Sequence, residues 1–230
     1  MYDINLVIPI YNEGEKTIKL LENFKKKINY KFQVLLCYDN LSDNVFDIKE
    51  KLNQLNIDIK YIKNPLDGPC EAIKEGLKNK QANCSIVYPA DDFVNFDLVN
   101  SMYKLFLAGN EIVVPSRFIK GGSMKKCPLI KAILVRGASF FLYITKSVAV
   151  QDSTNGFRLF SKKILDTFEI ESTLGFAYSI ELLVKASKKN MKISELPAKW
   201  EERDDGSRSR FKIINWFPDY WRWFLYGLLK

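Results

Sequence analysis

The first half of the chain alternates short apolar runs with amphipathic segments, and this alternation constrains the fold more than any other feature of the sequence. The apolar runs are rich in Ile, Val and Leu and are predicted to be strands at residues 4–10, 32–38, 57–62, 84–89 and 111–115. The segments between them are predicted to be helices at residues 14–28, 43–55, 69–79 and 96–108. Strands that alternate with helices of this length indicate βαβ units, and therefore an α/β fold with a mostly parallel central sheet.

The pattern changes in the second half. Residues 112–151 contain no Asp or Glu but include seven basic residues. A strongly apolar helix is predicted at 129–146, a further helix at 176–189 and a strand at 191–196. The aromatic C-terminal segment is predicted to be helical, with a break before Pro218. No repeat or low-complexity linker divides the chain, so we expect a single domain of residues 1–230.

The composition excludes several kinds of chemistry. The 230 residues include no histidine, which rules out Ser-His-Asp and Cys-His catalysis and every His-ligated metal site. Any metal site must therefore use oxygen ligands, which suits Mg²⁺ or Mn²⁺. The four cysteines form no CxxC pair and are expected to be reduced thiols. The net charge of +8 indicates anionic partners, such as phosphates, nucleic acid or an acidic membrane surface.

From the sequence we expect neither a signal peptide nor a membrane-spanning helix. Asp3 and Asn5 interrupt the N-terminus before any apolar stretch of sufficient length. The most apolar uncharged stretch, residues 137–145, is well short of the roughly 20 residues that a spanning helix needs. We therefore expect a cytoplasmic location.

Polar and charged side chains follow several of the predicted strands. In an open α/β sheet, ligands bind at the carboxyl ends of the strands. The residues found there are Pro9, Tyr11, Asn12, Glu13, Asp39, Asp43, Asp91, Asp92, Ser116 and Arg117. Clustered carboxylates repel one another unless a cation or a donor-rich ligand joins them. A nucleotide diphosphate with a divalent metal fits this requirement, with Arg117 helping to neutralise the phosphates.

Five motifs in order resemble a known family. They are IPIYNEGE at 8–15, YDNLSD at 38–43, PADD at 89–92, PSRFIKGG at 115–122 and DSTNGFRLF at 152–160. Together they resemble a family-2 glycosyltransferase of GT-A fold, and in particular the polyprenyl (dolichyl) phosphate sugar synthases. The resemblance implies a nucleotide-sugar-binding half at residues 1–118 and an acceptor-binding half with membrane-proximal amphipathic helices at 119–230.

The resemblance also implies roles for the residues of the donor half. Pro9, Tyr11 and Glu13 match the opening motif, which embraces the base and ribose. Asp39 matches an acidic residue that contacts the base or ribose. Asp43 matches a further acidic position, but an Asp that opens a helix is more often an N-cap.

The metal motif departs from the family pattern. Asp91 matches the second Asp of the DxD motif, whereas Pro89 replaces the first. Asp92 is expected to compensate, so Asp91 and Asp92 are the predicted ligands of Mg²⁺ or Mn²⁺. Since adjacent residues of an extended chain point to opposite sides, this pairing is not the usual clamp.

Further candidates lie in the second half. Asp152, Asn155 and Arg158 match the D-x-x-SGF-R stretch, and Arg158 is counted among the donor-binding residues. Asp152 is the first acid after the acid-free stretch, and its cationic surroundings should keep it ionised. Arg203 and Ser209 belong to a loop that resembles one closing over the donor diphosphate. Arg136 is expected either to face an anionic lipid or acceptor phosphate, or to extend to solvent.

The resemblance implies an inverting glycosyltransferase that uses a UDP- or GDP-sugar. A polyprenyl phosphate acceptor is already anionic and needs little help from a base, whereas a sugar hydroxyl of a glycan needs one, for which Asp152 is the candidate. Two other classes stay open: a sugar-phosphate nucleotidyltransferase, and a non-enzymatic binder of nucleic acid or membranes. We expect no nucleic-acid partner, because such a binder leaves the clustered carboxylates unexplained.

The aromatic and basic segments predict where the protein works. Trp and Tyr favour the lipid–water interface, and basic residues favour anionic headgroups. The apolar helix at 129–146 and the C-terminal segment are therefore expected to form one face on the cytoplasmic leaflet, beside the acceptor site. The alternative is that the aromatic residues fill the core or form a homodimer interface.

Overall fold

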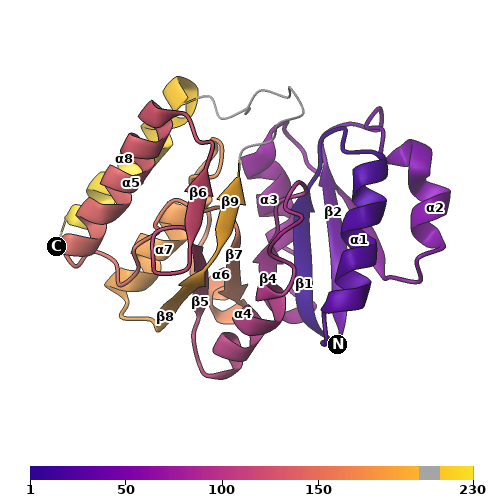
Figure 1. The fold of residues 1–230 in the computed structure, drawn as a ribbon, viewed down its shortest axis with the longest axis horizontal. Coiled ribbons are helices and arrows are strands. Elements are labelled where there is room, and N and C mark those ends of the chain that lie inside the picture. The colour runs from indigo at the N-terminus through magenta and orange to yellow at the C-terminus, as the bar shows by residue number, and fades with distance from the viewer. Residues whose placement is uncertain (202–212, 230) are drawn as a thin grey trace.

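The structure is a computed structural model that describes residues 1–201 and 213–229. Its centre is a seven-stranded sheet in the order β3-β2-β1-β4-β7-β5-β8 (Figure 1). These strands are β1 (Tyr2–Pro9), β2 (Phe32–Tyr38), β3 (Ile59–Lys63), β4 (Ala82–Val87), β5 (Ile112–Ser116), β7 (Arg158–Ser161) and β8 (Ile193–Pro197). A separate two-stranded parallel sheet pairs β6 (Ser123–Lys125) with β9 (Lys199–Glu201).

Helices cover both faces of the central sheet. They are α1 (Glu15–Lys27), the 3₁₀ turn η1 (Phe46–Ile48), α2 (Lys49–Asn53), α3 (Pro69–Leu77), α4 (Leu98–Leu107), α5 (Leu129–Ile144), α6 (Lys162–Thr167), α7 (Tyr178–Lys188) and α8 (Ile213–Leu228). Alternate residues of a strand point to opposite faces, so β1 supplies both cores. Leu6 and Ile8 pack in the core beneath α1 and α4, whereas Val7 packs in the core beneath α3 and α7.

The mostly parallel sheet predicted from the sequence is confirmed, with one strand reversed. β1 pairs in parallel with β2 and β4, as do β2 with β3 and β5 with β8. β7, which the sequence pattern did not predict, is antiparallel to both β4 and β5. Because β7 is reversed, its first residue, Arg158, lies opposite Val87 near the carboxyl end of β4. The segment that precedes β7 therefore reaches the same sheet edge as the residues that follow β4 and β5.

The predicted helices are present, with two differences. The expected helix at 43–55 is shorter and consists of η1 and α2. The break expected before Pro218 is absent, since α8 continues through this residue. Proline removes one backbone donor from a helix. Here the apolar side of α8 offsets that loss, because Trp223 is fully buried and Phe224 and Leu228 pack against the same core.

The two apolar helices α5 and α8 lie side by side at one end of the molecule (Figure 1). Phe141 of α5 and Phe224 of α8 are in contact, with ring centroids 5.8 Å apart. Many of the remaining apolar side chains of this pair are exposed: Leu129, Ile130, Ile133, Leu134, Phe140, Phe141, Tyr143 and Ile144 on α5, and Phe217, Trp221, Leu225 and Tyr226 on α8. We call these residues the α5/α8 face. Over the described residues, no helix is both long enough and apolar enough to cross a membrane.

Candidate active site

The candidate site lies along the edge where the parallel strands end. β1 is parallel to β2 and β4, and β5 runs in the same direction as β4 because both are antiparallel to β7. The loops that follow these four strands therefore meet at this edge. The predicted residues Tyr11, Asp39, Asp91 and Arg117 are all in those loops. The fold therefore brings the candidates from both halves to one side of the sheet.

The loops after β1 and β2 are joined through Asp43. One carboxylate oxygen accepts from the backbone N–H of Asn12 (2.8 Å) and the other from that of Val45 (2.9 Å). Asn44 in turn donates its N–H to the side-chain oxygen of Asn12. Asp43 is buried and ties the turn before η1 to the loop after β1. It is not the N-cap of η1, which is Val45. The bonded loop presents Tyr11, which is 49% exposed, and the half-buried Glu13 at the edge.

Asp39 is held by the loop that precedes α3. Its carboxylate accepts from the side-chain amide of Asn64 (2.5 Å) and from the backbone N–H of Gly68 (3.2 Å). Asn64 is 3% exposed and also donates to the carbonyl of Leu66 (2.7 Å). Gly68 has φ = 114°, a value that favours glycine. These contacts fix the direction of Asp39 where α3 begins.

The predicted metal ligands Asp91 and Asp92 differ in their surroundings. Asp91 is exposed directly beyond β4. Asp92 accepts from the N–H groups of Val94 and Asn95 on one oxygen (2.9 Å each) and from the Asn95 amide on the other (2.6 Å). Burial raises the pKa of Asp92, against these hydrogen bonds, which lower it. Asp92 is thus occupied inside its own turn.

This donor set fits a divalent metal only in a limited way. Over the described residues, no group of three or more Asp, Glu, His or Cys side chains could hold a metal ion. Mg²⁺ in proteins is often bound by one or two carboxylates together with substrate phosphates. The exposed Asp91 fits that arrangement, whereas a clamp by Asp91 and Asp92 requires Asp92 to give up its bonds within the turn.

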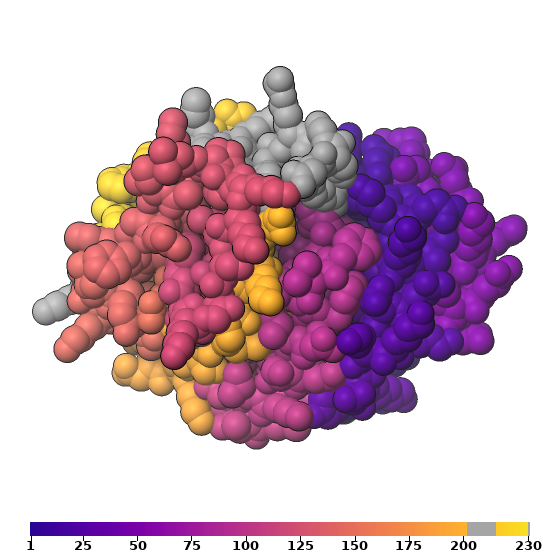
Figure 2. Space-filling view, in the orientation of Figure 1, coloured from indigo at the N-terminus to yellow at the C-terminus, as the bar shows by residue number. Residues whose placement is uncertain are grey.

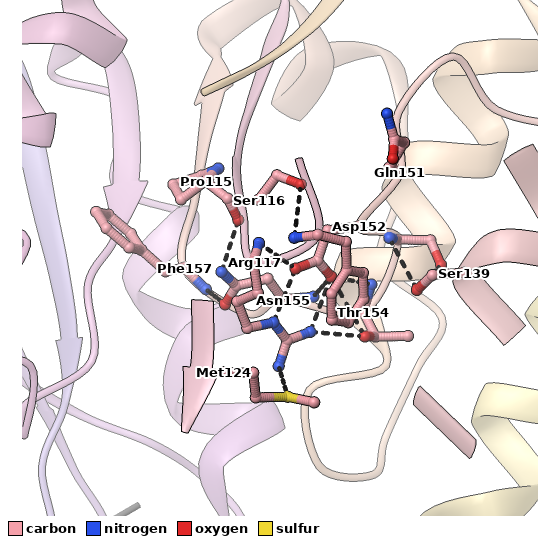
Figure 3. Close-up of polar contacts among 12 residues, drawn as sticks. Pro115, Ser116, Arg117, Met124, Ser139, Gln151, Asp152, Thr154, Asn155 and Phe157 are labelled. Carbon is pink, nitrogen blue, oxygen red and sulfur yellow. Dashed lines mark hydrogen bonds and ion pairs between the residues drawn. The ribbon is translucent and has the colours of Figure 1, made fainter. Parts of the chain in front are cut away.

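Arg117 and Asp152 form a buried ion pair at the centre of the site (Figure 3). One oxygen of Asp152 accepts from the backbone N–H (3.0 Å) and Nε (2.7 Å) of Arg117, and the other accepts from Nη2 (2.8 Å). Nη2 also donates to the Thr154 hydroxyl (2.9 Å). The Asp152 side chain is 0% exposed and that of Arg117 is 9% exposed. Burial acts to raise the pKa of Asp152, but Arg117 lowers it below its ordinary value, in the direction that the sequence predicts.

Backbone contacts hold this pair in place. The N–H groups of Thr154 and Asn155 donate to Asp152, and the Asn155 amide donates to the carbonyl of Pro115 (2.7 Å). Glu195 of β8 accepts the N–H of Gln151. Gly122 packs directly on the backbone before Arg117, where an added Cβ would lie 2.4 Å from the Ser116 carbonyl oxygen. The segment on each side of the ion pair is therefore fixed.

Three further residues were predicted to bind the donor: Arg158, Arg203 and Ser209. Arg158 is completely buried at the start of β7, where its guanidinium donates to the carbonyls of Ser179 and Asp152. Burial lowers the pKa of Arg158 to about 10. The expected contact of Arg158 with the donor is thus not available in this geometry, because the core encloses the side chain. Arg203 and Ser209 lie outside the described residues.

A small pocket beside the ion pair was not predicted from the sequence. Its volume is about 140 Å³, and Phe118, Arg136, Phe140, Tyr143 and Gln151 line it. The guanidinium of Arg136 lies 5.2 Å from the centroid of the Phe118 ring, and that of Arg117 lies 5.1 Å from the same ring. The pocket thus joins an apolar wall to positive charge. It opens on α5, next to the α5/α8 face.

The mostly parallel sheet, with its loops gathered at one edge and helices on both faces, is the GT-A fold of glycosyltransferases. Residues 5–168 match the family model described as glycosyl transferase family 2, and the chain belongs to that family. The predicted enzyme class, a glycosyltransferase, is confirmed. The alternatives of a nucleotidyltransferase and of a non-enzymatic binder are not supported by this membership.

Characterised relatives and solved structures agree with the predicted resemblance. The chain is 24% identical over 200 residues to a dolichol-phosphate mannosyltransferase of Pyrococcus furiosus, covering 84% of this chain but only 55% of that protein. It is 24% identical to a dolichyl-phosphate beta-glucosyltransferase of Saccharomyces cerevisiae, covering 91% of this chain and 70% of that protein. Glucosyl-3-phosphoglycerate synthase of Mycobacterium tuberculosis, solved with Mn²⁺ and UDP, shares the fold, with a TM-score of 0.72 and 12% identity over 99% of this chain and 80% of that one.

Proposed function

We propose that this glycosyltransferase moves a sugar from a UDP- or GDP-sugar to a polyprenyl phosphate at a membrane surface. The names of the relatives support the acceptor class, since they include dolichol-phosphate mannosyltransferase and dolichyl-phosphate beta-glucosyltransferase. We assign donor binding to residues 1–118 and acceptor binding to residues 119–230.

The observation that carries the proposal is the state of Asp152. Transfer to a sugar hydroxyl needs a base within hydrogen-bond reach of the proton that it removes. Both oxygens of Asp152 are taken by Arg117 and by backbone N–H groups, and the side chain is fully buried. A phosphate acceptor is anionic at neutral pH and needs no such base. The locked carboxylate therefore favours a lipid phosphate over a glycan acceptor.

The pocket beneath Arg136 supports an acceptor with a charged head and an apolar tail. Arg136 is exposed at a pocket whose other walls include Phe118, Phe140 and Tyr143. A phosphate fits next to the guanidinium, and the first carbons of a prenyl chain fit against the aromatic rings. In the space-filling view, the acid-free stretch of residues 112–151, coloured red to salmon, covers much of the left half of the molecule (Figure 2).

On the donor side, we assign Tyr11, Glu13 and Asp39 to the base and ribose. Asp91 would hold a divalent metal together with the oxygens of the donor diphosphate. When bound, Mg²⁺ or Mn²⁺ would offset the negative charge of the leaving diphosphate.

In the proposed reaction, an oxygen of the acceptor phosphate forms a bond to the anomeric carbon of the sugar. The bond from that carbon to the diphosphate breaks, and its electron pair goes to the diphosphate oxygen. The family resemblance implies inversion at the anomeric carbon. Arg136 orients the acceptor phosphate, while Asp152 keeps Arg117 fixed against the Phe118 ring, which lines the pocket.

The membrane part of the proposal rests on the α5/α8 face. Ile130 and Ile133 are exposed on α5 and flank Lys131 in the sequence, and Trp221 is exposed on α8 and precedes Arg222. We propose that this face contacts the cytoplasmic leaflet and that the pocket takes its acceptor from there. A homodimer that covers the same face is the competing outcome.

A transfer assay tests the function. The purified chain is incubated with UDP- and GDP-sugars, Mn²⁺ and one of three acceptors: a polyprenyl phosphate, the corresponding polyprenol without phosphate, or an oligosaccharide. We expect product only with the polyprenyl phosphate. Product with the oligosaccharide and none with the lipid phosphate would contradict the proposal.

A further inference from the structure

Asn95 is almost completely buried and joins two parts of the chain that are 104 residues apart. Its amide nitrogen donates to a carboxylate oxygen of Asp92 (2.6 Å) and to the carbonyl of Lys199 (2.7 Å). Its amide oxygen accepts the N–H of Lys199 (3.1 Å). The side chain thus uses both donors and its acceptor in one bridge.

One end of this bridge is the turn that carries Asp91. Asp92 closes the turn by accepting the N–H groups of Val94 and Asn95. The hydroxyl of Tyr88 donates to the carbonyl of Asp92 (3.1 Å). The residue next to Asp91 is therefore held through its backbone and through both carboxylate oxygens.

The other end of the bridge is the start of β9, which is tied to the Arg117 region. The residue before β9, Ala198, donates its N–H to the carbonyl of Ser116 (2.9 Å) and accepts the N–H of Ser123 (3.0 Å). Ser116 directly precedes Arg117. Asn95 thus connects the turn of Asp91 to the backbone that places the Arg117–Asp152 pair.

We propose that Asp92 and Asn95 are positioning residues, which hold the Asp91 carboxylate at the donor diphosphate and in register with Arg117. The inference rests on the proposed function, because the diphosphate is the ligand that Asp91 faces. It gives Asp92 a supporting role in place of the metal-ligand role expected from the sequence. Its physical reason is that catalysis is sensitive to displacements of about 1 Å in the groups that orient a substrate.

The test compares Asn95→Ala with a matched control, Asn110→Ala. Asn110 is also buried and donates to a backbone carbonyl, that of Leu105, but it precedes β5 and so lies at the opposite edge of the sheet. The measurements are the melting temperature, the affinity for UDP or GDP without metal, the Mn²⁺ concentration that half-saturates nucleotide binding, and kcat and KM for transfer.

For Asn95→Ala we expect a fall in kcat of about tenfold or more and a rise of about fivefold in the half-saturating Mn²⁺ concentration, because Asp91 is no longer held. Nucleotide affinity without metal should stay within about twofold, since the base and ribose contacts are elsewhere. Asn110→Ala should lower the melting temperature without changing the Mn²⁺ requirement. If the two variants change only the melting temperature, the positioning role is overturned.

If Asn95→Ala does not fold, a second test exchanges the amide and the carboxylate between Asn95 and Asp92, in two steps. Asn95→Asp alone places a second carboxylate against Asp92 and should raise the Mn²⁺ requirement. The double variant Asp92→Asn, Asn95→Asp restores one amide and one carboxylate in the turn and should recover part of the loss. No recovery, with both variants folded, would also overturn the inference. Because Mn²⁺-dependent nucleotide binding needs no acceptor, this readout stands even if the assay with polyprenyl phosphate fails.

Discussion

At the scale of single residues, the pair of Asp152 and Arg117 sets the chemistry of the site. A buried charge that loses its partner is strongly destabilising, by about 3–5 kcal/mol. We therefore expect Asp152→Asn to lower the free energy of unfolding by about 3 kcal/mol and to abolish transfer, because Arg117 then lacks its counter-charge. Urea unfolding at neutral pH measures the loss of stability. An unfolding free energy within 1 kcal/mol of the wild type would contradict a buried ion pair.

The same pair predicts a pH dependence. The pKa of Asp152 is lower in the folded chain than its ordinary value of 3.8, so the folded state favours the ionised form. The resulting stability is present above the unfolded pKa and is lost as the pH falls through the folded value. Below about pH 4, the unfolding free energy of Asp152→Asn should therefore fall less steeply with acid than that of the wild type. If the unfolding free energies of the two proteins fall equally steeply with acid, then ionised Asp152 does not stabilise the folded state.

If Asp39 binds the donor as proposed, that binding depends on how Asn64 holds Asp39. Without the Asn64 amide, Asp39 keeps only the Gly68 N–H among the contacts described above, and its direction is less fixed. We expect Asn64→Ala to weaken nucleoside diphosphate binding about fivefold to tenfold, with little change in kcat, since contacts to the base are equal in the ground and transition states. Calorimetric titration measures the affinity. Asn5→Ala, which removes a buried amide that donates to the Asn79 carbonyl, is the control and should affect stability alone.

At the scale of elements, the sequence predicts the parallel half well and the reversed strand not at all. Alternating apolar runs and amphipathic segments mark β1 to β5 because each buries its own face. β7 has only four residues and begins with Arg158, so no periodicity distinguishes it. Its direction is set by pairing with β4 and β5, which are more than forty residues earlier in the chain.

The same limit applies to the site. Asp39, Asp91 and Arg117 could be selected because they follow strands. The pairing of Arg117 with Asp152 joins residues 35 positions apart, and the bridge of Asn95 to Lys199 joins residues 104 positions apart. Neither has a local signal. Asn64 directly follows β3 and could have been selected by the same rule as Asp39, but it has no charge to draw attention to it.

Helix α8 is anchored through Glu181 of α7. The carboxylate of Glu181 is fully buried and accepts from the backbone and hydroxyl of Ser172 and from Lys185 (2.6 Å). The Ser172 hydroxyl in turn accepts from the indole N–H of Trp223 (2.8 Å). Glu181 therefore supports one of the polar contacts that hold α8, beside the N–H groups of Thr173 and Leu174, which donate to Asp219 of α8.

We expect Glu181→Gln to lower the free energy of unfolding by about 2 kcal/mol or more, because an amide cannot accept all these donors and Lys185 loses its buried partner, keeping its contacts with Glu169 and Glu171. Glu171→Gln is the control. Glu171 is exposed and pairs with Lys185 and Arg222, and surface pairs contribute about 0–1 kcal/mol. Chemical denaturation of both variants, followed by Trp fluorescence, measures the difference. Equal losses would mean that Glu181 does not anchor α8.

At the scale of the whole molecule, the proposed function uses two surfaces, the α5/α8 face for the membrane and the edge at the carboxyl ends of the strands for the donor. The aromatic residues of the C-terminal segment are divided as well: Trp223 is buried, as the core alternative expects, whereas Phe217, Trp221 and Tyr226 are exposed. Core packing therefore accounts for only part of this segment. For the exposed part we expect a lipid surface, with a second copy of the chain as the alternative.

Vesicle flotation distinguishes these two partners. We expect the chain to float with vesicles containing anionic lipid and to detach as salt rises, since exposed charges are screened over about 8 Å at physiological ionic strength. Replacing Leu129, Ile130 and Ile133 together by Ser should lower the partition by a factor of ten or more, at about 1.5–3 kcal/mol for each fully buried apolar side chain. The matched control replaces Leu41 and Leu66, which are about equally exposed but lie in loops of the donor half. It should float like the wild type.

If the wild type does not float at low salt and instead sediments as a dimer that the triple Ser variant dissociates, then the face joins two copies of the chain and the acceptor is not drawn directly from the membrane.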